Sequence, residues 1–160
     1  MRIFVNRIAL ETERLRLYVA SQAEMEQIIE RQTDEELRKA YQEMLDGYLA
    51  HPEQEEWYAI WMVTRLDGVQ VGDLSFKGLN EDGSVEIGYG ISDEFQGQGY
   101  ATEAVTAAVN WALKQDGVLL VEAETEPDNT ASQRVLAKCG FVPNGIMGEE
   151  GPRYVRRYGL

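Results

Sequence analysis

Residues 86–102 read EIGYGISDEFQGQGYAT, and this stretch decides the fold because it joins a strand pattern to the start of a helix. Its first part belongs to a strand with two unlike faces. The apolar face holds Val85, Ile87, Tyr89 and Ile91. The opposite face holds Glu86, Gly88 and Gly90. Further on, Gly97 and Gly99 stand at the helix entrance, although glycine inside a helix costs about 1 kcal/mol relative to alanine. The two glycines indicate a tight turn or the close approach of a ligand to the backbone.

The helix that follows is predicted over residues 101–114, where apolar residues recur at helical spacing. The first turn of a helix has unpaired N–H groups and carries about half a positive charge, so it can bind phosphate without a lysine. We therefore predict that a diphosphate binds this segment, and a plain tight loop is the structural alternative. The predicted contacts are Gln96, Gly97, Gln98, Gly99, Tyr100, Ala101 and Thr102.

Two other nucleotide-binding motifs compete for the glycine-rich segment. A P-loop ends in Gly-Lys-Ser/Thr, and here Tyr100 follows the last glycine, which excludes that motif. A dinucleotide-binding turn needs a third glycine where Thr102 stands, and its glycines directly follow the strand. The dinucleotide alternative keeps one supporting feature, because Glu122 and Glu124 end the next predicted strand at a suitable spacing to meet a ribose.

The remaining chain alternates between strand and helix patterns without a repeat or a linker. Strands are predicted at 14–19, 57–65, 69–76, 85–91, 118–125, 142–147 and 153–158, and helices at 22–31, 34–49, 101–114 and 129–139. Most strands follow one another, and residues 85–125 form a single strand-helix-strand crossover. We expect one α/β domain over residues 1–160, with its core at 11–160, a mixed sheet and about four helices.

The net charge of the chain limits the kinds of partner that it is expected to bind. The 160 residues include 15 Lys and Arg against 28 Asp and Glu, a net charge of −13. Such acidity repels phosphate backbones, so we expect no nucleic-acid partner and favour a cationic one, with solubility as the alternative reason for the charge.

The composition also indicates the cellular compartment in which we expect the protein. No apolar run approaches the roughly 18 residues of a membrane span, and the N-terminus lacks a signal peptide because Arg2, Asn6 and Arg7 interrupt its apolar residues. A cytoplasmic protein without a membrane partner is expected. His51 is the only histidine and Cys139 the only cysteine, so no metal site is predicted. Cys139 is expected to be a small buried packing group.

Three blocks in this order resemble the GNAT superfamily of N-acetyltransferases, in particular its RimJ/RimL-like branch. The first is the strand at 86–91, and the second is Gln96-x-x-Gly99-x-Ala101, which is similar to the family's pyrophosphate-binding signature. The third is NTASQRVLAKCGF at 129–141. With the opening ERLRL at 13–17, the resemblance covers nearly the whole chain.

The resemblance implies a mostly antiparallel sheet in which two parallel strands, 85–91 and 118–125, splay apart around the pantetheine arm of acetyl-CoA. Amide groups near Ile91 would bind that arm as an added strand would be bound. They would also bind the thioester carbonyl and so form an oxyanion site. Asn129 is implied beside the pantetheine, although capping of the last helix explains it almost as well. Gly88 and Gly90 fit a close approach of the ligand, and a bulge or twist in the strand is the alternative. No metal is implied.

The implied reaction is direct attack of an amine on the thioester, which requires a neutral amine and a proton for the leaving thiolate. Glu86 is the first candidate for the base or for holding its water, and Glu124 is the second; both are also explained as ordinary carboxylates. The tyrosine that many family members use as the acid corresponds to Leu136 here. Ser132 is the nearest replacement, with helix capping as its alternative role, and a coenzyme A thiolate also leaves without a dedicated acid.

We therefore expect an acyl-CoA-dependent N-acetyltransferase that acts on a primary amine, either a protein or peptide α-amine or a small cationic amine. A non-catalytic module that binds acyl-CoA as a regulatory ligand is the alternative, because Leu136 replaces the tyrosine. The acceptor pocket is expected between the two N-terminal helices and the terminal strands. Aromatic residues that could line it, or instead fill the core, are Trp57, Tyr58, Trp61 and Tyr154. Either a monomer or a homodimer is compatible with the sequence.

Overall fold

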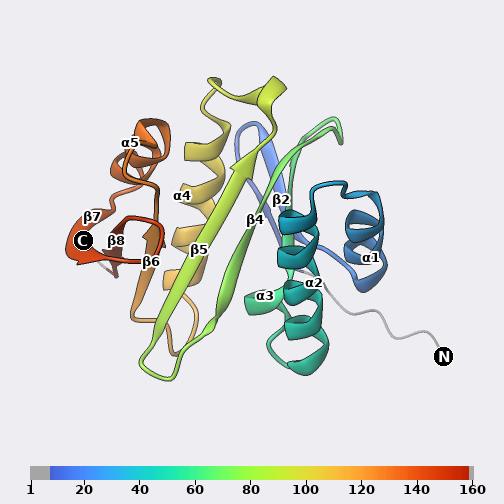
Figure 1. The fold of residues 1–160 in the computed structure, drawn as a ribbon, viewed down its shortest axis with the longest axis horizontal. Helices are drawn as coiled ribbons and strands as arrows, with labels where there is room; N and C mark the ends of the chain where they lie inside the picture. The colour runs from blue at the N-terminus through green and yellow to red at the C-terminus, as the bar shows by residue number, and fades with distance from the viewer. Residues whose placement is uncertain (1–7, 159–160) are drawn as a thin grey trace.

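One mixed sheet organises the computed structural model, which describes residues 8–158 (Figure 1). In spatial order its eight strands are β1 (Ala9–Glu11), β2 (Leu15–Val19), β3 (Ile60–Arg65), β4 (Gln70–Leu79), β5 (Ser84–Ile91), β6 (Leu120–Glu124), β8 (Pro152–Arg157) and β7 (Val142–Met147). Every neighbouring pair is antiparallel except β5 and β6. This confirms the predicted mixed, mostly antiparallel sheet. The expectation about a signal peptide rests on residues 1–7, which lie outside the described residues.

The parallel pair β5 and β6 separates after a short contact. Ser84, Val85 and Glu86 pair with Leu120, Val121 and Glu122. Beyond Glu86, β5 continues to Ile91, and no strand formed by residues 8–158 pairs with that edge. Figure 1 shows β5 running past the end of β6. The strands therefore leave an opening in the sheet, at the place where the family resemblance implies one.

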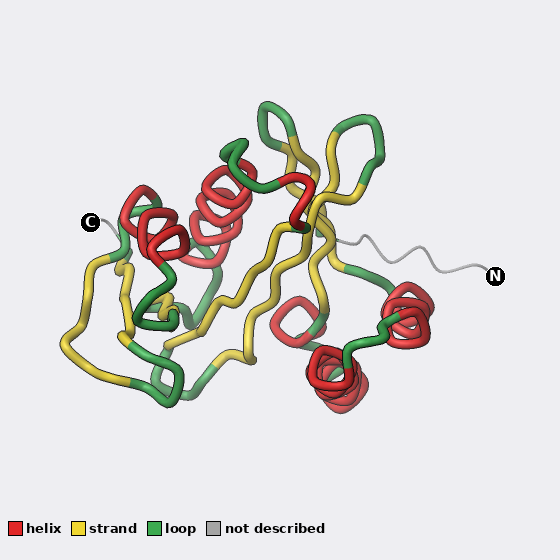
Figure 2. Tube along the Cα trace, turned by 45° about the horizontal axis from the view of Figure 1, so that its top comes forward, coloured by secondary structure: helices red, strands yellow, loops and turns green. Residues whose placement is uncertain are grey.

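Helices cover both faces of the sheet. The first group is α1 (Gln22–Arg31), α2 (Glu35–Ala50) and the single turn α3 (Glu55–Tyr58). The second group is α4 (Tyr100–Leu113), which is the crossover between β5 and β6, and α5 (Thr130–Lys138). Figure 2 shows the two groups on opposite sides of the strands.

Four aromatic rings form the centre of the core: Trp57, Trp61, Phe76 and Trp111. Five pairs of these rings are in contact, with centroids 4.9–6.0 Å apart in edge or tilted arrangements, which suits the quadrupoles of aromatic rings. Trp57 and Trp61 are buried, so they are core residues and do not line an acceptor pocket. Tyr58 stacks on His51, with ring centroids 4.0 Å apart.

The prediction of a strand from residue 57 was wrong at its start. Residues 55–58 form α3, Ala59 is its C-cap, and the strand begins only at Ile60. The Trp61 indole N–H donates to the carbonyl oxygen of Glu56 at 2.9 Å and holds this turn against the strand. A single helical turn of aromatic residues has no periodicity that separates it from a strand. As a result, α3 adds one helix to the four predicted.

None of the helices formed by residues 8–158 combines the length and the apolar composition needed to cross a lipid bilayer.

Candidate active site

The loop from β5 to α4 has an exposed backbone that only glycine adopts easily. Gly97 and Gly99 have φ of 76° and 83°, the left-handed region that side chains disfavour. A Cβ atom at Gly97 would meet no protein atom within 4 Å, and one at Gly99 would meet only the Arg14 guanidinium, at 3.3 Å. A side chain at position 97 would meet no steric obstacle, so the positive φ is the reason that glycine is favoured there.

The last part of this loop and the first turn of α4 contain a row of backbone amides that have no acceptor in the described part of the chain. Within residues 8–158, none of the backbone N–H groups from Gly97 to Thr102 donates to a protein atom, and the first paired one is that of Glu103, which donates to Gly99 O at 3.1 Å. Ser21, Asp34 and Asn129 cap the starts of α1, α2 and α5 with their side chains, whereas Gly99 at the start of α4 provides none. A row of free amides at a helix N-terminus is an anion-binding arrangement.

Arg14 fixes the loop from its outer side. It donates to Gln98 O at 2.9 Å and to the Glu103 carboxylate at 2.7 Å, and its guanidinium lies 4.6 Å from the centre of the Tyr100 ring. Burial alone would raise the pKa of Glu103, but the hydrogen bonds from Thr12 and Arg14 outweigh it and lower that pKa. The negative charge in the first turn of α4 is thus compensated.

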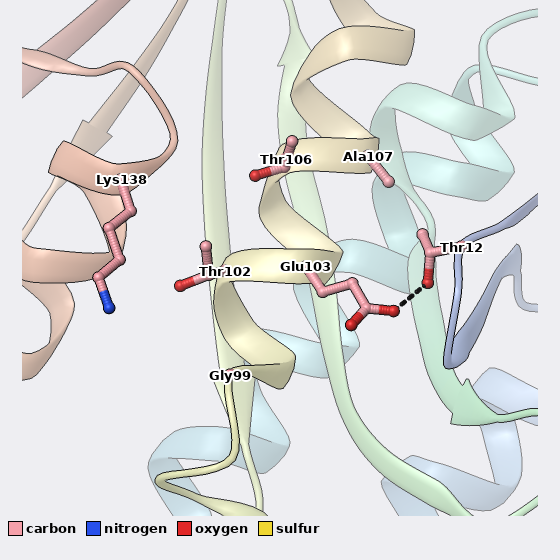
Figure 3. A pocket seen from close by; sticks show the side chains of 7 residues that line it. All are labelled: Thr12, Gly99, Thr102, Glu103, Thr106, Ala107 and Lys138. Carbon is pink, nitrogen blue, oxygen red and sulfur yellow. Dashed lines mark hydrogen bonds between the residues drawn. The ribbon is translucent and has the colours of Figure 1, made fainter.

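A cavity of about 460 Å³ lies beside the start of α4. Figure 3 shows Thr102 from α4 and Lys138 from the last turn of α5 reaching into the space between the two helices, while Glu103 turns toward Thr12. No ion pair within residues 8–158 involves Lys138. Lys138 stands in the block at 129–141 that resembles the family, but it was not among the contacts predicted from the sequence. A lysine near the end of a helix has no local signal that distinguishes it from a solvated charge.

Gln96 and Ile91 connect the loop to the strand. The Gln96 side-chain amide donates to Ile91 O at 2.9 Å and to Asp93 Oδ1 at 3.3 Å, so it braces the loop. The Ser92 N–H donates to Val71 O of β4 at 2.9 Å. Because successive N–H groups of a strand alternate between its two edges, the Ile91 N–H points toward the opening between β5 and β6.

The opening contains a second cavity, of about 280 Å³. Residues from five parts of the chain line it: Lys77 of β4, Glu86 and Tyr89 of β5, Glu124 of β6, Asn129 and Ser132 at the start of α5, and Glu150. Predicted site residues more than 40 positions apart therefore share one cavity. Gly88 also lines it, and a Cβ at Gly88 or Gly90 would meet no atom within 4 Å. Both glycines lie in regular register with β4, so neither forms a bulge there.

Glu86 is held as an anion by two cations. Its carboxylate accepts from Lys77 Nζ and from Arg153 Nη2, both at 2.7 Å. Arg153 also donates to Glu122 and Glu124, at 2.6 and 2.7 Å. Burial tends to raise the pKa of Glu86, but the hydrogen bonds from Lys77 and Arg153 outweigh it, so the pKa lies below the ordinary value. Such a carboxylate can hold a water molecule and is a weak base by itself.

The depressed pKa of Glu86 predicts a contribution to stability that depends on pH. This contribution is complete above the ordinary pKa of a glutamate, about 4.3, and is lost as the pH falls below it through the depressed pKa. Urea unfolding from pH 6 to pH 3 should therefore show a shallower loss of unfolding free energy in Glu86→Gln than in the parent. Glu26→Gln, at an exposed position of α1, serves as the control; equal slopes for Glu86→Gln and the parent would contradict the ion-paired state.

Two hydroxyl groups meet on the other side of β5. Tyr89 Oη lies 2.8 Å from Ser132 Oγ, and the Ser132 backbone N–H donates to Asn129 Oδ1 at 3.0 Å, so Asn129 caps α5. Burial is the main cause that raises the pKa of Tyr89, partly offset by the Ser132 hydrogen bond, so the phenol stays protonated at neutral pH. Leu136 is fully buried, so its side chain contributes to the core. The alternation of residues 85–91 predicted Tyr89 on the apolar face of the strand and gave no indication of the contact that its hydroxyl makes.

Cys139 and His51, the two other residues considered from the sequence, make contacts of a structural kind. Cys139 is buried, and its sulfur lies 3.3 Å from Thr106 Oγ1, in agreement with a packing role. His51 ends α2, and its ring Nδ1 lies 2.9 Å from Gly47 O. No group of His, Cys, Asp and Glu side chains within residues 8–158 has the arrangement of a metal site.

Known proteins with a similar sequence are N-acetyltransferases by name. The profile of the Acetyltransferase (GNAT) domain family matches residues 2–142. The uncharacterized N-acetyltransferase YjdG of Bacillus subtilis (strain 168) is 36% identical over 86 residues, which are 52% of this chain and 51% of that protein. The chain thus spans about half the length of the curated relatives it matches.

Solved structures share the fold at low sequence identity. The RimL ribosomal L7/L12 alpha-N-protein acetyltransferase superposes with a TM-score of 0.74 at 17% identity, covering 98% of each chain. The spermidine N-acetyltransferase from Vibrio cholerae, in complex with CoA and spermine, has a TM-score of 0.72 at 16% identity and covers 91% of this chain and 96% of that one.

Proposed function

Since the chain belongs to the GNAT acetyltransferase domain family, we propose that it transfers an acetyl group from acetyl-CoA to a primary amine. The observation that carries the proposal is the row of amides from Gly97 to Thr102, which have no protein acceptor within residues 8–158 and start an uncapped helix. A diphosphate is the ligand that such a row suits best. Residues 1–160 would form one catalytic domain.

The other predicted contacts fit the remaining parts of acetyl-CoA. Lys138 lies on the same cavity as Gly99 and Thr102, where it would add positive charge for the phosphates. The Ile91 N–H faces the opening in the sheet, and Asn129 lines the cavity there, so both would contact the pantetheine arm. Acetyl-CoA supplies the activated acyl group, and the protein supplies position and proton transfer. No metal is needed for this chemistry.

Glu86 and Tyr89 would serve two different proton transfers, one on each face of β5. Side chains of a strand alternate, so residues 86 and 89 point to opposite faces. We assign the amine to the Glu86 face, where the fixed carboxylate holds a water molecule that accepts the proton of the amine. As the new C–N bond forms and the C–S bond breaks, Tyr89 would donate its proton to the sulfur, with Ser132 as its hydrogen-bonding partner.

The type of amine sets how much help the base must give. At pH 7 an α-amine requires about 1–1.4 kcal/mol for deprotonation, and a lysine side chain about 4.6 kcal/mol. The ion-paired Glu86 and its water molecule would therefore contribute more to the reaction of an alkyl amine than to that of an α-amine. Protein α-amines and polyamines are represented among the structural neighbours, since one is named for a ribosomal-protein α-amine and another was solved with spermine. The acceptor is thus proposed as an α-amine or a small cationic amine.

Thiol release from acetyl-CoA in the presence of an amine panel tests the proposal. The panel should contain N-terminal peptides and mono-, di- and polyamines, and product mass should increase by one acetyl group. Release with at least one amine is expected. Tight coenzyme A binding without release for any amine would instead favour a regulatory acyl-CoA-binding module.

A further inference from the structure

Asp73 is a carboxylate on the strand next to β5, and no cationic side chain in the described part of the chain pairs with it. It lies on β4, opposite Gly90 of β5 and Met62 of β3. Cross-strand partners point to the same face of a sheet, so Asp73 shares the face of Gly88, Gly90 and Glu86. The Tyr41 hydroxyl donates to Asp73 Oδ2 at 2.8 Å. Among residues 8–158, no lysine or arginine forms an ion pair with Asp73.

The Asp73 carboxylate lines a cavity of about 370 Å³ between α1, α2 and the sheet. Two other charged residues line this cavity: Glu24, which accepts from the Ser21 N–H in the capping box of α1, and Arg31. Arg31 makes no ion pair with Asp73. Removing a carboxylate from water with one hydrogen bond is costly, and burial accordingly raises the pKa of Asp73, against the opposing effect of Tyr41. A bound cation would remove this cost.

A bare strip of β5 connects this cavity to the proposed reaction centre. Gly90, the partner of Asp73, lies four positions after Glu86, which corresponds to about 13 Å along an extended strand. Between them, Gly88 and Gly90 present no side chain, and the space above their Cα atoms contains no protein atom within 4 Å of a Cβ. A narrow aliphatic chain can therefore lie along the strand with one end at each carboxylate.

We propose that Asp73 and Tyr41 bind a second ammonium group of the acceptor, so that the acceptor is a small diamine or polyamine. The inference rests on the proposed acetyl transfer, and it adds the substrate class. The second ammonium group would pair with Asp73, while the first amine lies at the opening between β5 and β6. Charge complementarity supports this occupant over a neutral one, since no ion pair within residues 8–158 offsets the charge of Asp73, which lines the cavity.

The test compares acceptors that differ in one charge. Thiol release is measured with 1,4-diaminobutane, 1,6-diaminohexane and the monoamines butylamine and hexylamine. The parent should prefer a diamine over the monoamine of the same length by roughly tenfold or more in kcat/KM, the effect of one charge-assisted hydrogen bond. Asp73→Asn should remove most of this preference, and Tyr41→Phe part of it. Asp46→Asn, at an exposed position of α2, should retain it.

A binding readout keeps the subsite testable without turnover. Diamines should raise the Tm of the parent and of Asp46→Asn, and should fail to raise that of Asp73→Asn, whose far-UV circular dichroism reports whether it folds. Equal kcat/KM for diamine and monoamine in the parent, or a preference that survives Asp73→Asn, would overturn the subsite while leaving acetyl transfer intact. Absence of turnover with every amine would count against the proposed function, and the Tm shifts would then decide the subsite alone.

Discussion

Gly97→Val is expected to weaken coenzyme A binding by about a hundredfold or more, measured by isothermal titration calorimetry. The diphosphate would lose at least two charge-assisted hydrogen bonds, each contributing about 1.5–3 kcal/mol, and tenfold in affinity corresponds to about 1.4 kcal/mol. Two effects combine in this variant. Valine resists the φ of 76° that aims the loop amides outward, and its branched side chain occupies the free space where the phosphates would lie.

Gly68→Val is the matched control for that experiment. Gly68 lies in the turn between β3 and β4, has a φ of 91°, and likewise has no protein atom within 4 Å of a Cβ. The backbone strain in the two variants is therefore similar, and only Gly97 borders the row of free amides. Gly68→Val should bind coenzyme A like the parent although its stability falls. If Gly97→Val also binds like the parent, the amide row is not the phosphate site.

The sequence predicted much of the fold because its periodic segments are long. The alternation of residues 85–91 and the helical spacing of residues 101–114 were confirmed as β5 and α4 within a residue or two. The predicted helix at 22–31 coincides with α1, whose start is fixed by the Ser21 and Glu24 capping box. Short elements escaped prediction, since α3 spans four residues and β1 three, too few for a periodic pattern.

The loop contacts could be predicted from sequence because they are backbone groups of one continuous segment. Tyr89, Lys138 and Asp73 could not, because their surroundings are produced by packing between elements distant in sequence. The hydroxyl pair joins β5 to α5 across 43 positions, and Asp73 meets Tyr41 across 32. For Glu86, the sequence predicted the position but not the ion pairs, since Arg153 lies on β8, 67 positions later in the chain.

Tyr89→Phe is expected to lower kcat by about a hundredfold, at the lower end of what a general acid contributes. The parent hydroxyl lies on the face of β5 opposite Glu86, beside the N-terminus of α5, where a departing thiolate would be stabilised by both. Phenylalanine preserves the packing of the ring, so the KM for acetyl-CoA should change little. Stopped-flow measurement of thiol release at saturating amine would separate the chemical step from product release.

A readout on the bound thiol distinguishes an acid from a packing residue. A hydrogen bond from Tyr89 to the thiolate favours the charged form, so it lowers the pKa of the thiol of bound coenzyme A, and Tyr89→Phe should raise that pKa. The ultraviolet absorbance of the thiolate, titrated in the complex, measures it. Tyr158→Phe, at an exposed position after β8, should change neither the thiol pKa nor kcat. Should Tyr89→Phe lower kcat while the thiol pKa stays that of the parent complex, Tyr89 positions Ser132 and does not donate the proton, and Ser132→Ala would then show the larger shift in thiol pKa.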